Sequence, residues 1–393
     1  MAHYDHLIIG GGMTASAAAK AIRELRPNDS IGVVGSDPHP SYNRPPLSKG
    51  LWKGDPEEKV WRGLDKLGAS LFLGRTATSL DPSLKQVTDD TGEVHTYGKL
   101  LFATGGTPRQ LKDAPDGVIY YRTLDDYREL RNAAKAGSTT AVIGGGFIGS
   151  EIAAGLAVNG VKVTMIFPES GIGARNYPAG LSDFIGGYYR EKGIEVLANE
   201  SLKSVEKRGD GFTLHTESGK SIDADTVVAG IGITPNVELA QKAGLKVDNG
   251  IVVDEHLETS IPDIYAAGDV ANFYNPALGN RLRVEHEDNA NSMGAAAGKN
   301  MAGQDAPYDY LPMFYSDLFD LGYEAIGEMD ARHEIVEDWK KQPFEEGVVY
   351  YLKDGRVRGV LLWNTWDQVD NARELIASPG PFTAEQLKGR LPK

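Results

Sequence analysis

The chain has 393 residues and a formal net charge of −14, with 41% hydrophobic and 24% charged residues. This length and composition are typical of a globular protein with two or three domains. The negative charge argues against binding to nucleic acid, and the absence of cysteine excludes disulfides, thiolate metal sites and a catalytic thiol. No apolar run is long enough to span a membrane and no targeting peptide precedes the first strand, so we expect a cytoplasmic protein without a membrane span.

The N-terminal region has the pattern of a dinucleotide-binding β–α–β unit. An apolar strand at residues 7–9 leads into a G-x-G-x-x-A run formed by Gly10, Gly12 and Ala15, and a helix is expected over residues 15–25. The first glycine permits a tight turn and the second permits close approach of a pyrophosphate. The small third residue allows the helix to pack closely against the strand.

The rest of this unit supports the same interpretation. Met13 and Thr14 stand just before the expected helix, and a helix N-terminus favours an anion such as a pyrophosphate. A second strand is predicted over residues 31–35, and Asp37 follows it. An acidic residue at this place commonly binds the ribose of a dinucleotide.

A loop stiffened by two prolines follows at residues 42–49, and the pattern then changes to short strands. These strands are predicted at residues 70–73, 76–80, 86–88, 93–97 and 99–103.

A second glycine run lies in mid-chain, after a helix predicted over residues 122–136. Gly144, Gly146 and Gly149 form a complete G-x-G-x-x-G, 134 residues after the first run. A helix to residue 160, a strand at residues 161–167 and then Glu169 follow. This duplication of a fold unit predicts two dinucleotides, or one dinucleotide and a related phosphate ligand.

The later part of the chain returns to strands and ends in a different pattern. Further strands are predicted at residues 195–197, 203–207, 211–215 and 225–229, and a helix at residues 287–301. From residue 310 the chain becomes rich in aromatic residues, with strands at residues 347–352 and 358–363 and a helix at 368–377. This pattern favours a separate α+β domain with an antiparallel sheet.

Taken together, these motifs resemble a known family. The matching stretches are residues 8–15, 42–49, 103–109, 142–151, 266–271, 285–288, 313–327 and 358–364. They resemble the FAD-dependent pyridine nucleotide oxidoreductases of the glutathione-reductase-type fold, and among these apoptosis-inducing factor and the ferredoxin, putidaredoxin and rubredoxin reductases.

The resemblance implies an α/β fold with two Rossmann-like dinucleotide-binding domains and a C-terminal α+β domain. We expect a discontinuous FAD-binding domain at residues 1–111 and 245–309. An NAD(H)-binding domain would cover residues 112–244, and the C-terminal domain residues 310–393.

The resemblance also implies residues for FAD. Asp37 and Ser36 would lie at the adenosine ribose, Asp269 at the ribityl chain, and Glu285 and His286 at the isoalloxazine ring. The complete set implied for FAD is Gly10, Gly12, Met13, Thr14, Ser36, Asp37, Arg44, Lys49, Ala77, Arg122, Asp269, Glu285 and His286.

The second fingerprint would hold NADH. A carboxylate at Glu169 would bind the 2′-hydroxyl of NAD and repel the 2′-phosphate of NADP. The residues implied for NAD(H) are Gly146, Phe147, Ile148, Gly149, Glu151, Glu169, Arg175, Gly232 and Tyr315. Lys49, Glu151 and Tyr315 are implied to be catalytic, with Lys49 and Glu151 as a pair beside the flavin N5 atom and the Tyr315 ring stacked near the nicotinamide or the flavin.

Each of these side chains also has an ordinary structural interpretation. Lys49 is equally well a solvated loop lysine, and Asp269 a helix cap. His286 is equally well a structural histidine, and Tyr315 part of a packed core. Only the resemblance favours a functional role for these residues.

The expected chemistry is hydride transfer from NADH to flavin, followed by electron donation to an acceptor. The absence of cysteine excludes the dithiol relay of disulfide reductases. The resemblance to apoptosis-inducing factor favours a slow NADH oxidoreductase. The alternatives are an NADH-dependent ferredoxin or rubredoxin reductase, and a redox-gated binding protein that uses the FAD–NAD complex as a switch.

The expected partners are NADH and a small iron–sulfur or rubredoxin-type electron carrier, and a homodimer is a candidate assembly. An acidic carrier would need a positive patch on this chain. The candidates are Lys49, Lys53, Lys59, Arg62, Lys340, Lys341, Lys353, Arg356 and Arg358.

Overall fold

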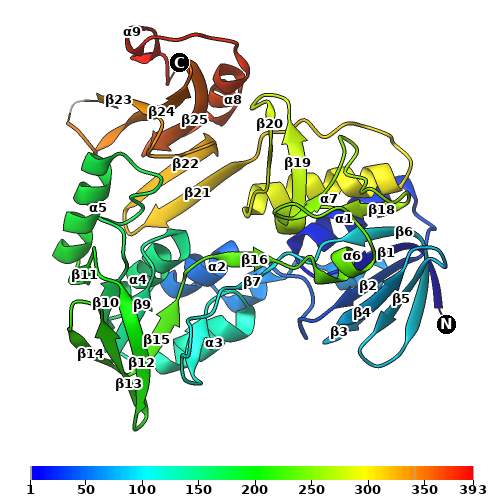
Figure 1. The fold of residues 1–393 in the computed structure, drawn as a ribbon, viewed down its shortest axis with the longest axis horizontal. Helices are drawn as coiled ribbons and strands as arrows, with labels where there is room; N and C mark the ends of the chain where they lie inside the picture. Colours follow the sequence, from blue (N-terminus) through cyan, green and yellow to red (C-terminus); the bar gives the residue numbers. More distant parts are fainter. Residues whose placement is uncertain (1, 341, 393) are drawn as a thin grey trace. The chain divides into compact units, whose positions relative to one another are not determined.

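The computed structural model of the protein describes residues 2–340 and 342–392. Its contacts group the chain into two compact units. The first comprises Met1–Asn43, Glu58–Thr107 and Thr234–Met313, and the second comprises Arg44–Glu57, Pro108–Ile233 and Phe314–Lys393. Each unit contains one of the glycine fingerprints, and Figure 1 labels the elements of both. Two short strands, β7 (Gly106–Pro108) and β16 (Ile233–Pro235), lie where the chain passes from one unit to the other.

The first unit is built on a sheet with the strand order β3-β2-β1-β6-β5-β4, in which β18 also pairs with β6. The strands β3, β2, β1, β6 and β18 run parallel, and β5 and β4 continue the sheet in antiparallel pairs. The strands are β1 (Ala2–Ile9), β2 (Ile31–Gly35), β3 (Ser70–Leu73), β4 (Ala77–Asp81), β5 (Gln86–Asp89), β6 (Val94–Phe102) and β18 (Ile264–Ala266). The central strands are buried, as expected for a parallel sheet covered by helices.

Smaller elements complete the first unit. A three-stranded sheet has the order β17-β19-β20, formed by Ile251–Val252, Ala271–Asn275 and Asn280–Leu282. The helices are α1 (Met13–Leu25), α6 (Glu238–Lys242) and α7 (Glu287–Met301), and the 3₁₀ turns are η3 (Leu64–Leu67) and η4 (Gly268–Val270), with η2 (Glu57–Val60) beginning at the unit boundary.

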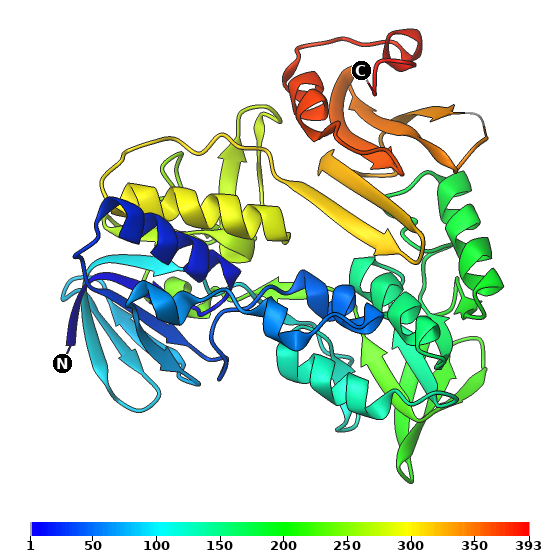
Figure 2. The same cartoon turned by 180° about the vertical axis from the view of Figure 1, so that it is seen from behind.

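Helices α1 and α7 pack with their backbones in close contact, and Figure 2 shows them side by side in dark blue and yellow. A Cβ atom at Gly298 would lie 2.4 Å from the Ala18 carbonyl oxygen, and one at Gly294 would lie 2.6 Å from the Thr14 carbonyl oxygen. Side chains at these two positions would force the helices apart. The two glycines therefore set the distance between α7 and the helix of the first fingerprint.

The second unit contains a parallel sheet with the order β11-β10-β9-β15-β8 and an antiparallel sheet with the order β12-β13-β14. The strands of the first are β8 (Val118–Tyr120), β9 (Thr139–Ile143), β10 (Lys162–Ile166), β11 (Glu195–Leu197) and β15 (Thr226–Ala229). Those of the second are β12 (Leu202–Arg208), β13 (Gly211–Thr216) and β14 (Ser221–Ala224). The helices of this region are α2 (Pro45–Ser48), α3 (Leu124–Ala133), α4 (Phe147–Val158) and α5 (Ala179–Glu191), with the 3₁₀ turn η1 (Gly50–Lys53) after α2.

The C-terminal part of the second unit is an antiparallel sheet with the order β21-β22-β25-β24-β23. Its strands are β21 (Met313–Leu318), β22 (Leu321–Gly327), β23 (Glu334–Lys340), β24 (Glu346–Lys353) and β25 (Arg356–Trp363), followed by α8 (Val369–Ala377) and α9 (Ala384–Leu387). Tyr323 and Trp363 stack in its core with ring centroids 6.1 Å apart, and both are fully buried. These aromatic side chains account for the compositional change that begins near residue 310.

Most of the predicted elements are present, with two informative errors. The predicted break between strands at residues 97–99 is wrong, because β6 runs without interruption through Gly98. A Cβ atom at Gly98 would lie 2.8 Å from the Asp5 carbonyl oxygen, so this glycine serves close strand approach and not a turn. The helix predicted at residues 122–136 is shorter, because Thr123 and Asp126 form a capping box that starts α3 at Leu124.

The parallel sheets of the two fingerprint regions and the antiparallel C-terminal sheet agree with the predicted fold class. The division into three domains, with its boundaries, stays a prediction. No helix within the described ranges is both long enough and apolar enough to cross a membrane.

The close packing of α1 against α7 gives a stability prediction. We expect Gly298→Ala to lower the free energy of unfolding by about 1–3 kcal/mol, because the added methyl group overpacks the crossing. The matched control is Gly187→Ala in α5, where a Cβ atom would meet nothing within 4 Å. This control gains up to about 1 kcal/mol from helix propensity. Urea denaturation measures both variants, and equal stabilities would contradict the proposed role of Gly298.

Candidate active site

The first fingerprint has the geometry of a tight strand–turn–helix connection. Gly10 has a φ of +108°, and a Cβ atom there would lie 2.2 Å from the Ala103 carbonyl oxygen at the end of β6. Gly12 precedes α1 as its N-cap without a side-chain hydrogen bond, and Met13 begins the helix. Thr14 is buried in the first turn against Gly268, whose φ is +76°.

The second fingerprint repeats this geometry in the second unit. Gly144 has a φ of +114°, and a Cβ atom there would lie 2.4 Å from the Gly230 carbonyl oxygen at the end of β15. A Cβ atom at Gly149 would lie 2.1 Å from the Gly144 carbonyl oxygen, so the third glycine allows α4 to pack directly on the turn. Close backbone contacts therefore require the first and third glycines of this fingerprint, as the sequence pattern predicts.

The middle glycine, Gly146, differs from its two neighbours in the pattern because it faces open space. A Cβ atom at this position would meet nothing within 4 Å. Gly146 is the N-cap of α4, with no side-chain cap, and Phe147 and Ile148 begin the helix with Ile148 exposed. Open space before a helix N-terminus without a side-chain cap fits a pyrophosphate group.

The two acidic residues predicted at nucleotide ribose positions both have partners. In the first unit, the Tyr42 hydroxyl donates to Asp37 Oδ2 over 2.7 Å, and the His39 amide donates to Oδ1 over 3.0 Å. In the second unit, Glu169 Oε1 lies 2.5 Å from the guanidinium of Arg175. Arg175 is 79% exposed, whereas Glu169 is 23% exposed, so a half-buried carboxylate pairs with an exposed guanidinium group.

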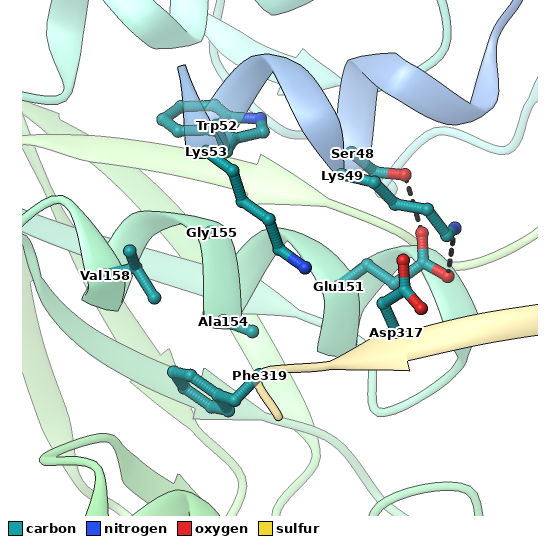
Figure 3. Close-up of a pocket in the computed structure, with 10 residues that line it drawn as sticks. All are labelled: Ser48, Lys49, Trp52, Lys53, Glu151, Ala154, Gly155, Val158, Asp317 and Phe319. Carbon is teal, nitrogen blue, oxygen red and sulfur yellow. Dashed lines mark hydrogen bonds and ion pairs between the residues drawn. The ribbon is translucent and has the colours of Figure 1, made fainter. Parts of the chain in front are cut away.

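Lys49 and Glu151 form a buried ion pair in the second unit. Lys49 Nζ lies 2.6 Å from Glu151 Oε1, and the two side chains are 12% and 4% exposed. Figure 3 shows the two side chains pointing toward each other, Lys49 from the end of α2 and Glu151 from α4, beside a hollow that Trp52, Lys53 and Phe319 also line. The interpretation of Lys49 as a solvated loop residue is therefore wrong.

The loop that carries Lys49 is anchored on α4. The Trp52 ring lies where a side chain at position 155 would be, since a Cβ atom at Gly155 would come within 2.9 Å of it. Trp52 Nε1 donates to the Leu47 carbonyl over 2.8 Å, and the Asn159 amide donates to the Trp52 carbonyl over 2.9 Å. These contacts fix the position of the residue that follows α2.

Two serine hydroxyls complete the surroundings of Glu151, and the sequence did not identify either of them. Ser48 Oγ donates to Glu151 Oε2 over 2.6 Å, and Ser316 Oγ donates to Oε1 over 2.6 Å. Both serines are buried. Ser316 comes from β21, far from α4 in the sequence, so no local pattern could have indicated this contact.

Tyr315 contacts the same ion pair from β21. Lys49 Nζ lies 5.1 Å from the centroid of the Tyr315 ring, a cation–π distance. Tyr315 is 38% exposed, so its interpretation as core packing is wrong. An exposed ring beside a buried ion pair offers a flat surface for another planar group.

The remaining residues predicted at FAD in the first unit take varied positions. Ala77 is the half-buried first residue of β4, and Asp269 lies in η4. Glu285 pairs with Arg283 over 2.5 Å, and His286 is the N-cap of α7. Ser36 is exposed after β2.

Three further predicted residues belong to the second unit. Arg44 is the N-cap of α2. The Arg122 amide donates to Asp126 Oδ2 over 2.9 Å, just before α3. Gly232 has a φ of +92° and accepts a hydrogen bond from the Arg109 amide over 2.9 Å. The structure thus brings Lys49, Glu151 and Tyr315 together, while the predicted roles of the other residues at FAD and NAD(H) stay predictions.

Several residues of the expected positive patch are already neutralised by partners. Lys340 pairs with Glu346 over 2.6 Å, and Arg358 pairs with Glu328 over 2.8 Å. Arg62 is half-buried and donates to Asn43 and Asn291. Lys341 lies outside the described residues. The patch is therefore weaker than the count of basic residues suggested.

One cluster in the first unit has ligand types that bind metals. Asp89, Glu93 and His95 bring their ligand atoms within 4.8 Å of one another. Arg75 contacts both carboxylates, at 3.0 Å from Asp89 and 2.5 Å from Glu93. Because this guanidinium already pairs with both carboxylates, we assign no metal to the cluster.

Comparison with known proteins identifies the family. Residues 4–294 match the family model of the pyridine nucleotide-disulphide oxidoreductases. The chain belongs to this family. Residues 297–343 and 332–378 also match the C-terminal model of mitochondrion-associated apoptosis-inducing factor. The chain is accordingly an FAD-dependent oxidoreductase that uses NAD(H), as predicted.

Relatives of known function cover nearly the whole chain. It is 34% identical to the mitochondrial apoptosis-inducing factor 1 of Dictyostelium discoideum, over 95% of this chain and 78% of the relative. It is also 34% identical to the ferredoxin–NAD(+) reductase component of the anthranilate 1,2-dioxygenase system of Burkholderia cepacia, over 97% of this chain and 96% of the relative. The fold matches that in the covalent putidaredoxin reductase–putidaredoxin complex with a TM-score of 0.90 and 29% identity, over 98% of this chain and 95% of the other.

The open space at Gly146 gives a binding prediction. We expect Gly146→Ala to weaken NADH binding by roughly ten-fold or more, which corresponds to about 1.4 kcal/mol, because the methyl group occupies space before the helix N-terminus. Its stability should change by less than about 1 kcal/mol. Fluorescence titration with NADH measures the affinity, with Gly187→Ala as control. Unchanged NADH affinity would show that no pyrophosphate lies at Gly146.

Proposed function

We propose that the protein is an NADH-dependent reductase of a small iron–sulfur electron carrier. The observation that supports this most strongly is the end-to-end similarity to a ferredoxin–NAD(+) reductase component, over 97% of this chain and 96% of the relative. FAD, when bound, supplies hydride acceptance from NADH and onward release of electrons. The chain contains no cysteine, so no thiol participates in this transfer.

The role of the protein residues is to bind FAD and NADH and to orient them. In this proposal the fingerprint at Gly10 binds the FAD pyrophosphate, and the fingerprint at Gly146 binds that of NADH. Lys49 presents a positive charge to the flavin, and buried Glu151 holds Lys49 in place. The exposed Tyr315 ring next to Lys49 would cover the planar group bound there.

A second candidate is a slow NADH oxidoreductase like apoptosis-inducing factor. The match of residues 297–343 and 332–378 to the C-terminal model of that protein favours it. Here the acceptor is oxygen or a quinone, and the protein stays reduced for long periods. A redox-gated binding protein would depend on the same long lifetime of the reduced state. A homodimer and a cytoplasmic location stay predictions in either case.

The two candidates differ in what reoxidises the protein. We expect the purified protein to bind about one FAD per chain, since one of the two fingerprints is followed by the loop that carries Lys49. After anaerobic reduction with NADH, mixing with a ferredoxin should reoxidise it within seconds, and mixing with air should take longer. Stopped-flow absorbance in the flavin bands measures both rates. A protein that reacts with no carrier but persists reduced in air for minutes would support the second candidate.

The nucleotide preference is a separate prediction about Glu169. We expect Glu169→Ser to lower the ratio of kcat/KM for NADH to that for NADPH by about ten-fold or more, because Arg175 would then be available for a 2′-phosphate. The control is Glu191→Ser, which removes an exposed carboxylate from α5. Steady-state kinetics with both nucleotides give the ratio. A ratio that stays at the wild-type value would place the ribose away from Glu169.

A further inference from the structure

We infer that Ser316 of the C-terminal sheet is a positioning residue that orients the Glu151 carboxylate and thereby fixes the place of the Lys49 ammonium group. The inference rests on the proposed function only for the expected effect on the flavin midpoint potential. Its geometric part depends only on contacts within the second unit.

The carboxylate of Glu151 is held at both oxygens. Ser48 Oγ donates to Oε2, and Ser316 Oγ and Lys49 Nζ both contact Oε1, each over 2.6 Å. A carboxylate that is 4% exposed obtains little hydration, so these donors replace water. With one hydroxyl on each oxygen, the plane of the carboxylate is fixed, and Lys49 has one place in which to pair with it.

The strand that carries Ser316 lies beside a strand that is anchored by buried phenols. Strand β21 pairs with β22, which carries Tyr323, and the Tyr177 hydroxyl donates to the Tyr323 hydroxyl over 2.9 Å. Burial raises the pKa of Tyr177 and of Tyr323 well above that of an ordinary phenol, so both keep their protons. A buried, hydrogen-bonded pair of phenols thus adjoins the strand that supplies the Ser316 hydroxyl to Glu151.

These two phenols are held rigidly because they are packed in the aromatic core. Tyr323 stacks on Trp363, and Tyr177 meets Tyr323 edge-on with ring centroids 5.7 Å apart. The Tyr177 and Tyr323 side chains are almost completely buried. The position of Ser316 is therefore set by the core of the C-terminal sheet and not by local loop geometry, and the same core acts on Lys49 through Glu151.

Loss of the Ser316 hydroxyl leaves Oε1 with Lys49 as its remaining donor among those described above. Ser48 still holds Oε2, so the carboxylate is fixed by one hydroxyl instead of two and rotates more easily about its bond to the chain, and the ammonium group moves with it. We expect Lys49 to become more mobile and more accessible, and its charge to act less strongly on a flavin bound beside it.

The first test measures accessibility and needs no turnover. The protein as purified is treated with an amine-reactive ester, and labelling of Lys49 is followed by mass spectrometry. We expect Ser316→Ala to label at Lys49 roughly three-fold faster or more than wild type, since a hydrogen bond to a charged group is lost. The control is Ser182→Ala, which removes a buried serine hydroxyl that donates to the Ile172 carbonyl over 2.8 Å.

The second test measures the flavin midpoint potential. Lys49→Ala should lower the potential, because a positive charge that stabilises reduced flavin is removed. Ser316→Ala should lower it in the same direction and by a smaller amount, and Ser182→Ala should leave it unchanged. Ser316→Cys keeps the size of the side chain and replaces the hydroxyl by a weak S–H donor, so it should move both readouts in the same direction if Ser316→Ala does not fold.

The possible results distinguish a failure of this inference from a failure of the proposed function. Labelling of Lys49 and potentials that match those of Ser182→Ala would overturn the inference. Slower labelling of Lys49 in Ser316→Ala would also overturn it, because Ser316 would then compete with Lys49 for Oε1. If the protein fails to reduce any carrier but the labelling changes as expected, the proposed function fails and the positioning role of Ser316 stands.

Discussion

The contact on which the site depends is the buried ion pair between Lys49 and Glu151. A carboxylate with 4% exposure is costly to bury unless its oxygens are paired and hydrogen-bonded. The chain meets this requirement by bringing three distant segments together. The last residue of α2, Ser48, and the next residue, Lys49, come from the first, α4 supplies Glu151, and β21 supplies Ser316. The loop around Trp52 lies against α4 at Gly155, where a larger residue would push it and Lys49 away.

The first glycine of each fingerprint is subject to the same steric constraint. In each unit the first glycine has a positive φ and faces a carbonyl oxygen of the neighbouring parallel strand, at Ala103 in one case and Gly230 in the other. Substitution there would strain the backbone and create a collision as well. Gly146 has neither problem, so the fold itself does not require a glycine there, which agrees with the prediction that a pyrophosphate lies at this position.

Local features of the chain could be predicted from its sequence, and distant contacts could not. The helices after Gly12 and Gly146 were expected from glycine spacing, which acts over a few residues. The interpretation of Gly98 failed because its role depends on Asp5, which lies on another strand. Lys49 and Glu151 were paired by family resemblance alone. Ser316 was missed because a serine in a strand has no distinguishing pattern, and its contact is set by how β21 packs.

Because β21 supplies a donor to Glu151, the fingerprint regions are not an autonomous enzyme module. A shortened protein that ended before residue 315 would retain the glycine turns, both helix N-termini and the Lys49 loop. It would lack the hydroxyl on Oε1 and the Tyr315 ring over Lys49. Transplanting the nucleotide-binding regions onto another C-terminal domain would therefore require that domain to provide a serine and an aromatic residue in neighbouring positions of an equivalent strand. Replacement of the C-terminal domain in this protein is thus limited by two adjacent side chains, Tyr315 and Ser316, rather than by the position of a domain boundary.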